Sequence, residues 1–483
     1  MTAMPARTRP WLLWACLGVL GSAMVAVLPF SVGYLPDWPR GPINRHLPWF
    51  RRTTGFYLAR TSAVIGSVLL FAAWLKLRPR PHQGRSETPW RRIGLAWTVP
   101  MWPIPPVMTA DAYAYAAQGW LLGHGKNPYE VGMGFPSPFA DGIYQAWAHT
   151  TAVYPPLALQ LQRFLVWASG SDPYWSVVAM RVMALAGVGL MVAVAPALAR
   201  RVGIRPQAAL WAIALNPLVL VQFIGGAHND ALMVGLIMVA LWLAGRRHGL
   251  ILGSVAIGVA AAVKQPAILA GVGVVWCALF GDRPTERPHW GRALGGLGVG
   301  GFIGAAVFVL LSLPDRLMLG WMGPYAGAPS LVINHSPLSW IAQLLLRWKV
   351  DRDLVNTGLS VTSGILMLAG LAWVLWRFGP RRPVAMTAGS LLAFGLLGPA
   401  IQPWYVLWGG PLIPFTRPSA RMVRVCLAVV LVLLISGVLQ EFLPPPVVVP
   451  IGAAVALAWA LWDRRRSRRA GAVEASEPAG TLA

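Results

Sequence analysis

Acidic residues are the scarcest charged class in this chain of 483 residues: 16 Asp and Glu stand against 40 Lys and Arg, and charged residues together make up only 12%. Hydrophobic residues make up 56%, which is more apolar surface than one water-soluble core of this length would bury. A spanning helix needs ~20 mostly apolar residues, and about 12 to 14 runs are candidates. The composition therefore predicts an all-α polytopic protein of the plasma (inner) membrane.

Cysteine is nearly absent as well. Cys16, Cys277 and Cys426 all lie inside apolar runs, which argues against a disulfide framework and against a cysteine metal cluster. His228 has no partner at metal-ligand spacing, so a zinc site is not expected. The sequence also lacks an internal repeat and the paired broken helices of an inverted-repeat transporter. The cysteines are therefore expected to be packing residues.

The basic residues gather in short gaps between the apolar runs, so they do not indicate a nucleic-acid partner. Gaps rich in Lys and Arg alternate with poorer ones, and this positive-inside pattern predicts that the rich gaps and both termini are cytoplasmic. Arg51, Arg52 and the basic residues of 347–352 depart from the pattern. The rich gaps are 76–92, 200–205, 246–247, 283–292, 377–382, 417–424 and 464–469.

We expect one transmembrane domain over residues 1–469 and a disordered cytoplasmic tail over 470–483, which is polar. Within the domain, residues 109–174 form the longest stretch without a convincing span, and they are rich in Gly, Pro, Trp and Tyr. Non-helical backbone survives at a membrane only where protein or water satisfies it. The stretch 109–174 is therefore predicted to fold as an extracytoplasmic cap over a cavity.

Asp111 opens this predicted cap. If a helix starts here, Asp111, Tyr115 and Gln118 fall on one face at spacings of four and three. One interpretation is that Asp111 only caps the helix, where the helix dipole favours an acid. The other is that the carboxylate is functional, because an acid at the mouth of a span with no adjacent Lys or Arg is costly unless it is used.

A second polar group, His228, Asn229 and Asp230, begins an apolar run. The three side chains converge on the predicted outer face, and the alternative is that Asn229 or Asp230 merely caps the following helix. Lys264 separates two further apolar runs on the same side. Its ammonium could neutralise a phosphate held at the membrane surface, or the side chain could simply snorkel.

Aromatic and amide residues add to these outer sites. Rings with polar tips suit sugars as well as lipid headgroups, and the alternative for each is an interfacial aromatic belt. The candidates for substrate binding are Asn127, Tyr129 and Tyr154 in the cap, and Gln402, Trp404 and Tyr405 at the start of a later span.

Taken together, these motifs resemble the actinobacterial polyprenol-phosphate-mannose-dependent α-1,6-mannosyltransferases, which are GT-C class membrane glycosyltransferases. The resemblance runs from about Asp111 to Tyr405. Two positions depart from it: Ala114 stands where members often have Ser, and Tyr154-Pro-Pro stands where they often have Tyr-Gly-Pro. The matching motifs are Asp-Ala-Tyr-Ala-Tyr at 111–115 with Gln118-Gly119, Gly-Lys-Asn-Pro-Tyr at 125–129, Asn216-Pro217, Gly-Gly-Ala-His-Asn-Asp at 225–230, and Pro-Trp-Tyr at 403–405.

The resemblance implies a GT-C-like bundle that takes mannose from polyprenol-phosphate mannose outside the membrane and passes it, with inversion, to a mannan or glycolipid acceptor. By this resemblance the catalytic base is Asp111, and Lys264, His228 and Asn229 are candidates to meet the leaving phosphate. No cofactor is expected. The outer sites lack an Asp-x-Asp pair, which argues against a nucleotide sugar and a bound metal, although some GT-C relatives use a metal.

Two other functions compete with this one. The first is another polyprenol-dependent GT-C enzyme, such as an arabinofuranosyltransferase. The second is a transporter of lipid-linked sugars, which should place polar residues at midplane depth in several helices. The polar residues here gather at predicted outer helix ends instead, so the transporter is the weaker alternative.

Overall fold

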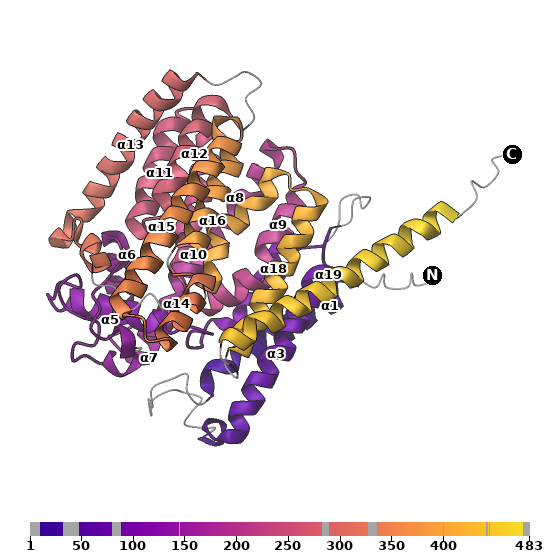
Figure 1. Ribbon diagram of the computed structural model, residues 1–483, viewed down its shortest axis with the longest axis horizontal. Helices are drawn as coiled ribbons and strands as arrows, with labels where there is room; N and C mark the ends of the chain where they lie inside the picture. Colours follow the sequence, from indigo (N-terminus) through magenta and orange to yellow (C-terminus); the bar gives the residue numbers. More distant parts are fainter. Residues whose placement is uncertain are drawn as a thin grey trace, which may run out of the picture. The chain divides into compact units, whose positions relative to one another are not determined.

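The computed structural model describes residues 10–31, 48–79, 88–143, 145–282, 289–326, 336–398, 400–440, 443 and 445–476. Within these ranges all regular secondary structure is helical (Figure 1), which confirms the predicted fold class. The contacts divide the chain into two units, Met1–Arg417 and Pro418–Ala483. The expected end of the transmembrane domain at residue 469 stays a prediction.

Among the described residues, the first unit contains the longer series of helices and the second contains two. In chain order the α-helices of the first unit are α1 (Pro10–Ala26), α3 (Thr53–Lys76), α4 (Trp90–Thr98), α5 (Asp111–Gly123), α6 (Pro156–Ala168), α7 (Pro173–Ala179), α8 (Arg181–Arg201), α9 (Pro206–Ala214), α10 (Asp230–Ala244), α11 (Gly249–Val263), α12 (Ala267–Phe280), α13 (Trp290–Ser312), α14 (Pro337–Arg347), α15 (Arg352–Arg377), α16 (Pro383–Leu397) and α17 (Val406–Gly409); those of the second are α18 (Ala420–Leu439) and α19 (Pro445–Ser476).

Six of the described helices are long and apolar enough to cross a membrane, and the bent pair 206–214 with 219–225 raises the number to seven. The protein is therefore a multi-pass membrane protein, although the expected 12 to 14 spanning helices are not reached. Several apolar runs form shorter helices: α10 and α11 have 15 residues and α12 has 14. At 1.5 Å per residue these reach only about 21 to 23 Å, less than the ~30 Å hydrocarbon core.

These helices are short because polar residues interrupt the apolar sequence. Helix α10 begins at Asp230, α11 ends immediately before Lys264, and α12 begins after Pro266. Helix α10 lies against α8, α11, α12 and α17. Its approach to α8 is close: a Cβ at Gly187 would come within 2.1 Å of the Ala231 backbone. The first of these interruptions, at Asp230, thus lies next to the close approach of α10 to α8.

The cap region contains α5, α6, α7 and the irregular chain between them. Figure 1 shows these three helices gathered at the lower left, next to one end of α11 and α13, both of which contact α6. Helices α5 and α6 cross closely, because Gly119 has no side chain to separate them: a Cβ there would lie 2.5 Å from the Gln162 backbone. Tyr113 and Tyr115 of α5 and Tyr154 belong to one buried hydrophobic cluster.

In the second unit, α18 and α19 contact each other. Helix α19 continues to Ser476, so it extends into the segment 470–483 that the sequence suggested would be disordered. Residues 477–483 of that predicted tail lie outside the described residues.

Candidate active site

Asp111 is the first residue of α5, but its carboxylate does not cap the helix. Ala110 occupies the N-cap position and makes no side-chain cap hydrogen bond. The Oδ2 atom of Asp111 accepts a hydrogen bond from the Tyr115 hydroxyl at 3.4 Å and lies 3.5 Å from Nδ1 of His228. The Tyr154 hydroxyl donates in turn to that of Tyr115 at 3.3 Å. Asp111 therefore takes part in a polar cluster, as the functional interpretation requires.

His228 reaches this carboxylate from an irregular segment. A π-helix, η6 (Val219–Gly225), ends just before it, and Ala227 takes a left-handed backbone conformation with φ of 55°. The turn directs the imidazole onto Trp404, with the two rings 3.8 Å apart and 24° from parallel. The segments around residues 111, 228 and 404, which are far apart in the sequence, thus meet at one place.

Lys264 is buried and paired. Its Nζ lies 2.8 Å from Oδ1 of Asp230 and donates to Oδ1 of Asn229 at 3.5 Å. Trp408 Nε1 donates to the same Asp230 oxygen. The Lys264 side chain is 9% exposed, so the snorkelling interpretation is wrong, and Asn229 makes no side-chain cap hydrogen bond. The pair joins α10 to the turn between α11 and α12.

Several buried polar atoms near these residues make no hydrogen bond within the described part of the chain. They are both ring nitrogens of His228, Nδ2 of Asn229, Nε1 of Trp404 and Oδ2 of Asp230. A buried polar group without a partner costs ~1–3 kcal/mol, and such groups are found where ligands bind. The stacking of His228 on Trp404 brings two of these side chains together.

The two carboxylates differ in access. Asp230 is fully buried and is engaged by Lys264 and Trp408, whereas the Asp111 side chain is 23% exposed. A general base must be reached by the hydroxyl that it deprotonates. Of the two acids, Asp111 is the more accessible.

Burial also sets the protonation of the groups around Asp111. It lowers the pKa of His228 below its usual value, so the ring is neutral at neutral pH and does not compensate the carboxylate charge. Burial raises the pKa of Tyr115 and of Tyr154 well above their usual values. Both hydroxyls therefore stay protonated and can donate towards the carboxylate.

Some residues expected at the site lie apart from this cluster. The Gln118 amide donates to Sδ of Met133. The Asn127 side chain contacts Glu130 and the backbone of Tyr129, whose hydroxyl donates to the Tyr154 carbonyl. These contacts give Asn127 and Tyr129 a role in shaping the cap loop.

The last two expected residues, Gln402 and Tyr405, flank Trp404. Gln402 precedes a short 3-10 helix, η10 (Pro403–Tyr405), without capping it by its side chain. The Tyr405 ring packs on Trp408 at 4.1 Å. The segment 402–408 therefore brings Trp404 to His228 and Trp408 to Asp230, and Trp408 was not expected from the sequence. The sequence feature that could have identified Trp408 is its spacing of one helical turn from Trp404.

Arg181 was also missed. It is 1% exposed, and its guanidinium donates five hydrogen bonds, to carbonyls of the segments 102–105 and 224–225. The first segment leads to Asp111 and the second to His228, and they also meet directly where Val107 N–H donates to the Gly225 carbonyl at 2.9 Å. Arg181 thus holds together the two loops that position these side chains. The sequence feature that could have identified Arg181 is its position, as an ionisable residue, at the start of an apolar helix.

We expect Arg181→Lys to lower kcat roughly tenfold or more while KM changes little. A lysine keeps the charge but lacks the planar guanidinium, which donates hydrogen bonds to both loops at once. A matched control is Arg201→Lys, about 30 Å away at the other end of α8 by helical rise. Arg201 pairs with Asp282, so its replacement should lower the thermal inactivation temperature without this kinetic effect. Equal kinetic changes in both variants would refute the positioning role.

An all-helical membrane protein with a reachable carboxylate beside buried, unpartnered donors has the features of a membrane glycosyltransferase. A family model described as alpha-(1→6)-mannopyranosyltransferase, N-terminal domain, matches residues 15–280, and one described as the MptB C-terminal domain matches residues 335–473. The chain belongs to this alpha-(1→6)-mannopyranosyltransferase family, and it is a mannosyltransferase.

Individual relatives agree with the family match. Alpha-(1→6)-mannopyranosyltransferase A of Mycobacterium tuberculosis is 32% identical over 409 residues, which cover 82% of this chain and 78% of the relative. The protein of the same name from Corynebacterium glutamicum is 27% identical, with 76% of this chain and 81% of the relative covered. Alpha-(1→6)-mannopyranosyltransferase B of that organism is 26% identical, with 86% and 75% covered.

Proposed function

We propose that the chain transfers mannose from polyprenol-phosphate mannose to a mannan or lipomannan-type acceptor, forming an α-1,6 linkage on the extracytoplasmic face of the membrane. The observation that carries this proposal is the reachable Asp111 carboxylate, held by Tyr115 beside His228. The relatives' names supply the sugar and the linkage.

The proposed reaction is a single displacement with inversion at the anomeric carbon. The acceptor hydroxyl forms a bond to that carbon while the bond from the carbon to the phosphate oxygen breaks. Asp111 accepts the hydroxyl proton as the new bond forms, and the polyprenol phosphate departs with the electron pair. One carboxylate is enough for this reaction, because no covalent intermediate forms and the leaving phosphate is already charged.

The departing phosphate needs hydrogen-bond donors or positive charge. In the proposed complex Nδ2 of Asn229 and Nε1 of Trp404 supply donors, since both are buried without partners in the described chain. The neutral His228 ring has a single N–H, which Nδ1 directs at the Asp111 carboxylate, so His228 positions Asp111 and Trp404 in this complex. Lys264 lies beside Asn229. Asp230 already balances the charge of Lys264. Lys264 therefore acts as part of its pair with Asp230, not as an isolated cation.

The proposed function is tested with purified protein, polyprenol-phosphate mannose and a short α-1,6-mannoside. We expect a product one mannose longer, with the new linkage α-1,6 by NMR. Offering the corresponding arabinofuranosyl donor tests the competing GT-C activity, and transfer from that donor alone would refute the proposal.

The orientation of the cap is tested by an introduced cysteine on a Cys16→Ser, Cys426→Ser background, because Cys16 is exposed and Cys426 partly exposed, whereas Cys277 is buried. Asp141 is the suitable position: it is exposed, whereas a Cβ at the neighbouring Gly142 would come within 2.6 Å of the Tyr113 ring. We expect Asp141→Cys to react with an impermeant thiol reagent in intact cells stripped of outer layers. Arg247→Cys, on the predicted cytoplasmic side, should react only after lysis. The opposite pattern would reverse the proposed orientation.

A further inference from the structure

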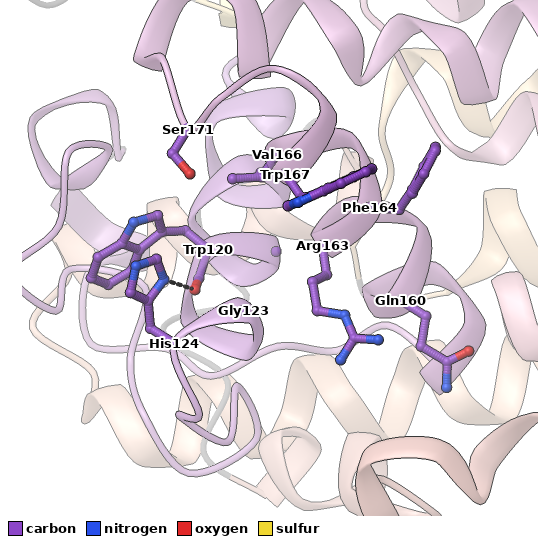
Figure 2. Close-up of a pocket in the computed structure, with 10 residues that line it drawn as sticks. Trp120, Gly123, His124, Gln160, Arg163, Phe164, Val166, Trp167 and Ser171 are labelled. Atoms are coloured by element: carbon purple, nitrogen blue, oxygen red, sulfur yellow. Dashed lines mark hydrogen bonds between the residues drawn. The ribbon is translucent and has the colours of Figure 1, made fainter.

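A pocket of about 380 Å³ lies between the C-terminal half of α5 and α6, apart from the Asp111 cluster. Its volume is within the range of small-molecule sites, ~300–1,000 Å³. Figure 2 shows Trp120 and His124 on one side of the pocket and Trp167, with Arg163 near it, on the other. Nothing in the displacement at Asp111 uses these residues.

The lining of the pocket combines aromatic faces with polar groups. The His124 ring is stacked on that of Trp120, with centroids 3.9 Å apart, and Trp167 is 73% exposed. The polar groups are the Arg163 guanidinium and the Ser171 hydroxyl (Figure 2). A pyranose ring has an apolar face of C–H groups and a rim of hydroxyls, so it fits such a lining better than a purely apolar ligand does.

The lining includes one ionised side chain, Arg163, which favours a water-filled site over a lipid-facing one. Arg163 Nη1 lies 2.7 Å from Oδ1 of Asp315, and the two side chains are 41% and 23% exposed. The Gln160 amide donates to the Leu311 carbonyl at 3.0 Å. Exposed charges of this kind are costly inside hydrocarbon.

Helix α5 connects the pocket to the candidate base. Asp111 is its first residue, and Gly123, which lines the pocket, is its last. Twelve residues of helical rise separate them by about 18 Å. Gly123 leaves this end of the helix open, because a Cβ there would meet only the Arg163 side chain, at 3.7 Å. A linear sugar chain of several units whose end lies at Asp111 is long enough to reach the pocket.

We propose that this pocket is a distal subsite for the acceptor, which binds mannosyl residues several units behind the one that is extended. The inference rests on the proposed function and adds to it a preference for acceptor length. Longer acceptors fill both the catalytic cluster and the pocket, whereas a disaccharide at Asp111 does not reach the pocket. The occupied pocket therefore lowers KM for long acceptors and leaves the chemical step unchanged.

The experiment compares an α-1,6-mannobioside with an α-1,6-mannohexaoside as acceptors for the purified full-length chain. We expect KM to be lower for the hexasaccharide. Trp167→Ala should raise the hexasaccharide KM about tenfold, which corresponds to about 1.4 kcal/mol, and leave the disaccharide kinetics unchanged. Gly123→Leu, which fills the pocket, should do the same. Trp175→Ala is the matched control. Trp175 is likewise an exposed tryptophan, at 50%, but it does not line the pocket.

Equal KM values for the two acceptors in the wild type, or a length preference that survives both substitutions, would overturn the inference. Stronger quenching by brominated lipids in the wild type than in Trp167→Phe would also overturn it, by placing Trp167 in the bilayer. If the wild type transfers no mannose at all, the proposed function fails. Binding of a labelled mannohexaoside in the absence of donor then tests the pocket separately, and it should be present in the wild type and lost in Trp167→Ala.

Discussion

Asp111→Asn should reduce mannosyl transfer by about 10² to 10⁴-fold, the usual contribution of general acid–base catalysis. Asn keeps the shape of the side chain and can still accept the hydrogen bond that Tyr115 donates to Asp111, but it cannot take the proton of the acceptor hydroxyl. The loss should appear in kcat, with protein yield and donor affinity close to those of the wild type.

The chain supplies a matched control for this substitution. Asp172 is a true N-cap residue, since its Oδ1 accepts a hydrogen bond from the Trp175 backbone N–H at 2.9 Å. Asn and Asp are nearly equivalent at N-caps, so Asp172→Asn should transfer mannose at close to the wild-type rate. If Asp111→Asn stays within a few-fold of the wild type, the proton leaves by another route and Asp111 is not the base.

The sequence predicted the all-helical fold from composition alone, because charged residues are too few and apolar runs too long for a water-soluble chain. It suggested 12 to 14 spans, whereas six or seven of the described helices or bent pairs are long and apolar enough to qualify. An apolar run is visible in the sequence, but the end of its helix depends on what surrounds it. Lys264 ends α11 after 15 residues because its ammonium is drawn inward to Asp230, and that partner lies far away in the sequence.

The same reasoning from the sequence predicted only part of the candidate site. Helical spacing placed Tyr115 one turn from Asp111, and the structure has this contact. The stacking of His228 on Trp404 depends on how separate segments pack, which a local pattern cannot specify. Spacing also put Gln118 on the same face, yet its amide is bonded to Met133 from the cap loop.

Lys264→Met should have the second large effect. Removing one partner of a buried ion pair costs ~3–5 kcal/mol, here because Asp230 would keep an uncompensated charge. We therefore expect a lower thermal inactivation temperature. If Lys264 also assists the donor phosphate, donor use should weaken by about 1.5–3 kcal/mol, the scale of a hydrogen bond to a charged group. Thermal inactivation and donor KM, measured on the same preparations, report the two effects.

The double variant Lys264→Met, Asp230→Asn separates these two effects. The amide removes the buried negative charge and can still accept the hydrogen bond that Trp408 donates to Asp230, so much of the lost stability should return. The donor KM should remain raised, because the ammonium is still missing beside Asn229. A donor KM restored to the wild-type value would show that Lys264 acts only by neutralising Asp230. The phosphate would then depend on Asn229 and Trp404, whose buried N–H groups lack partners within the described residues.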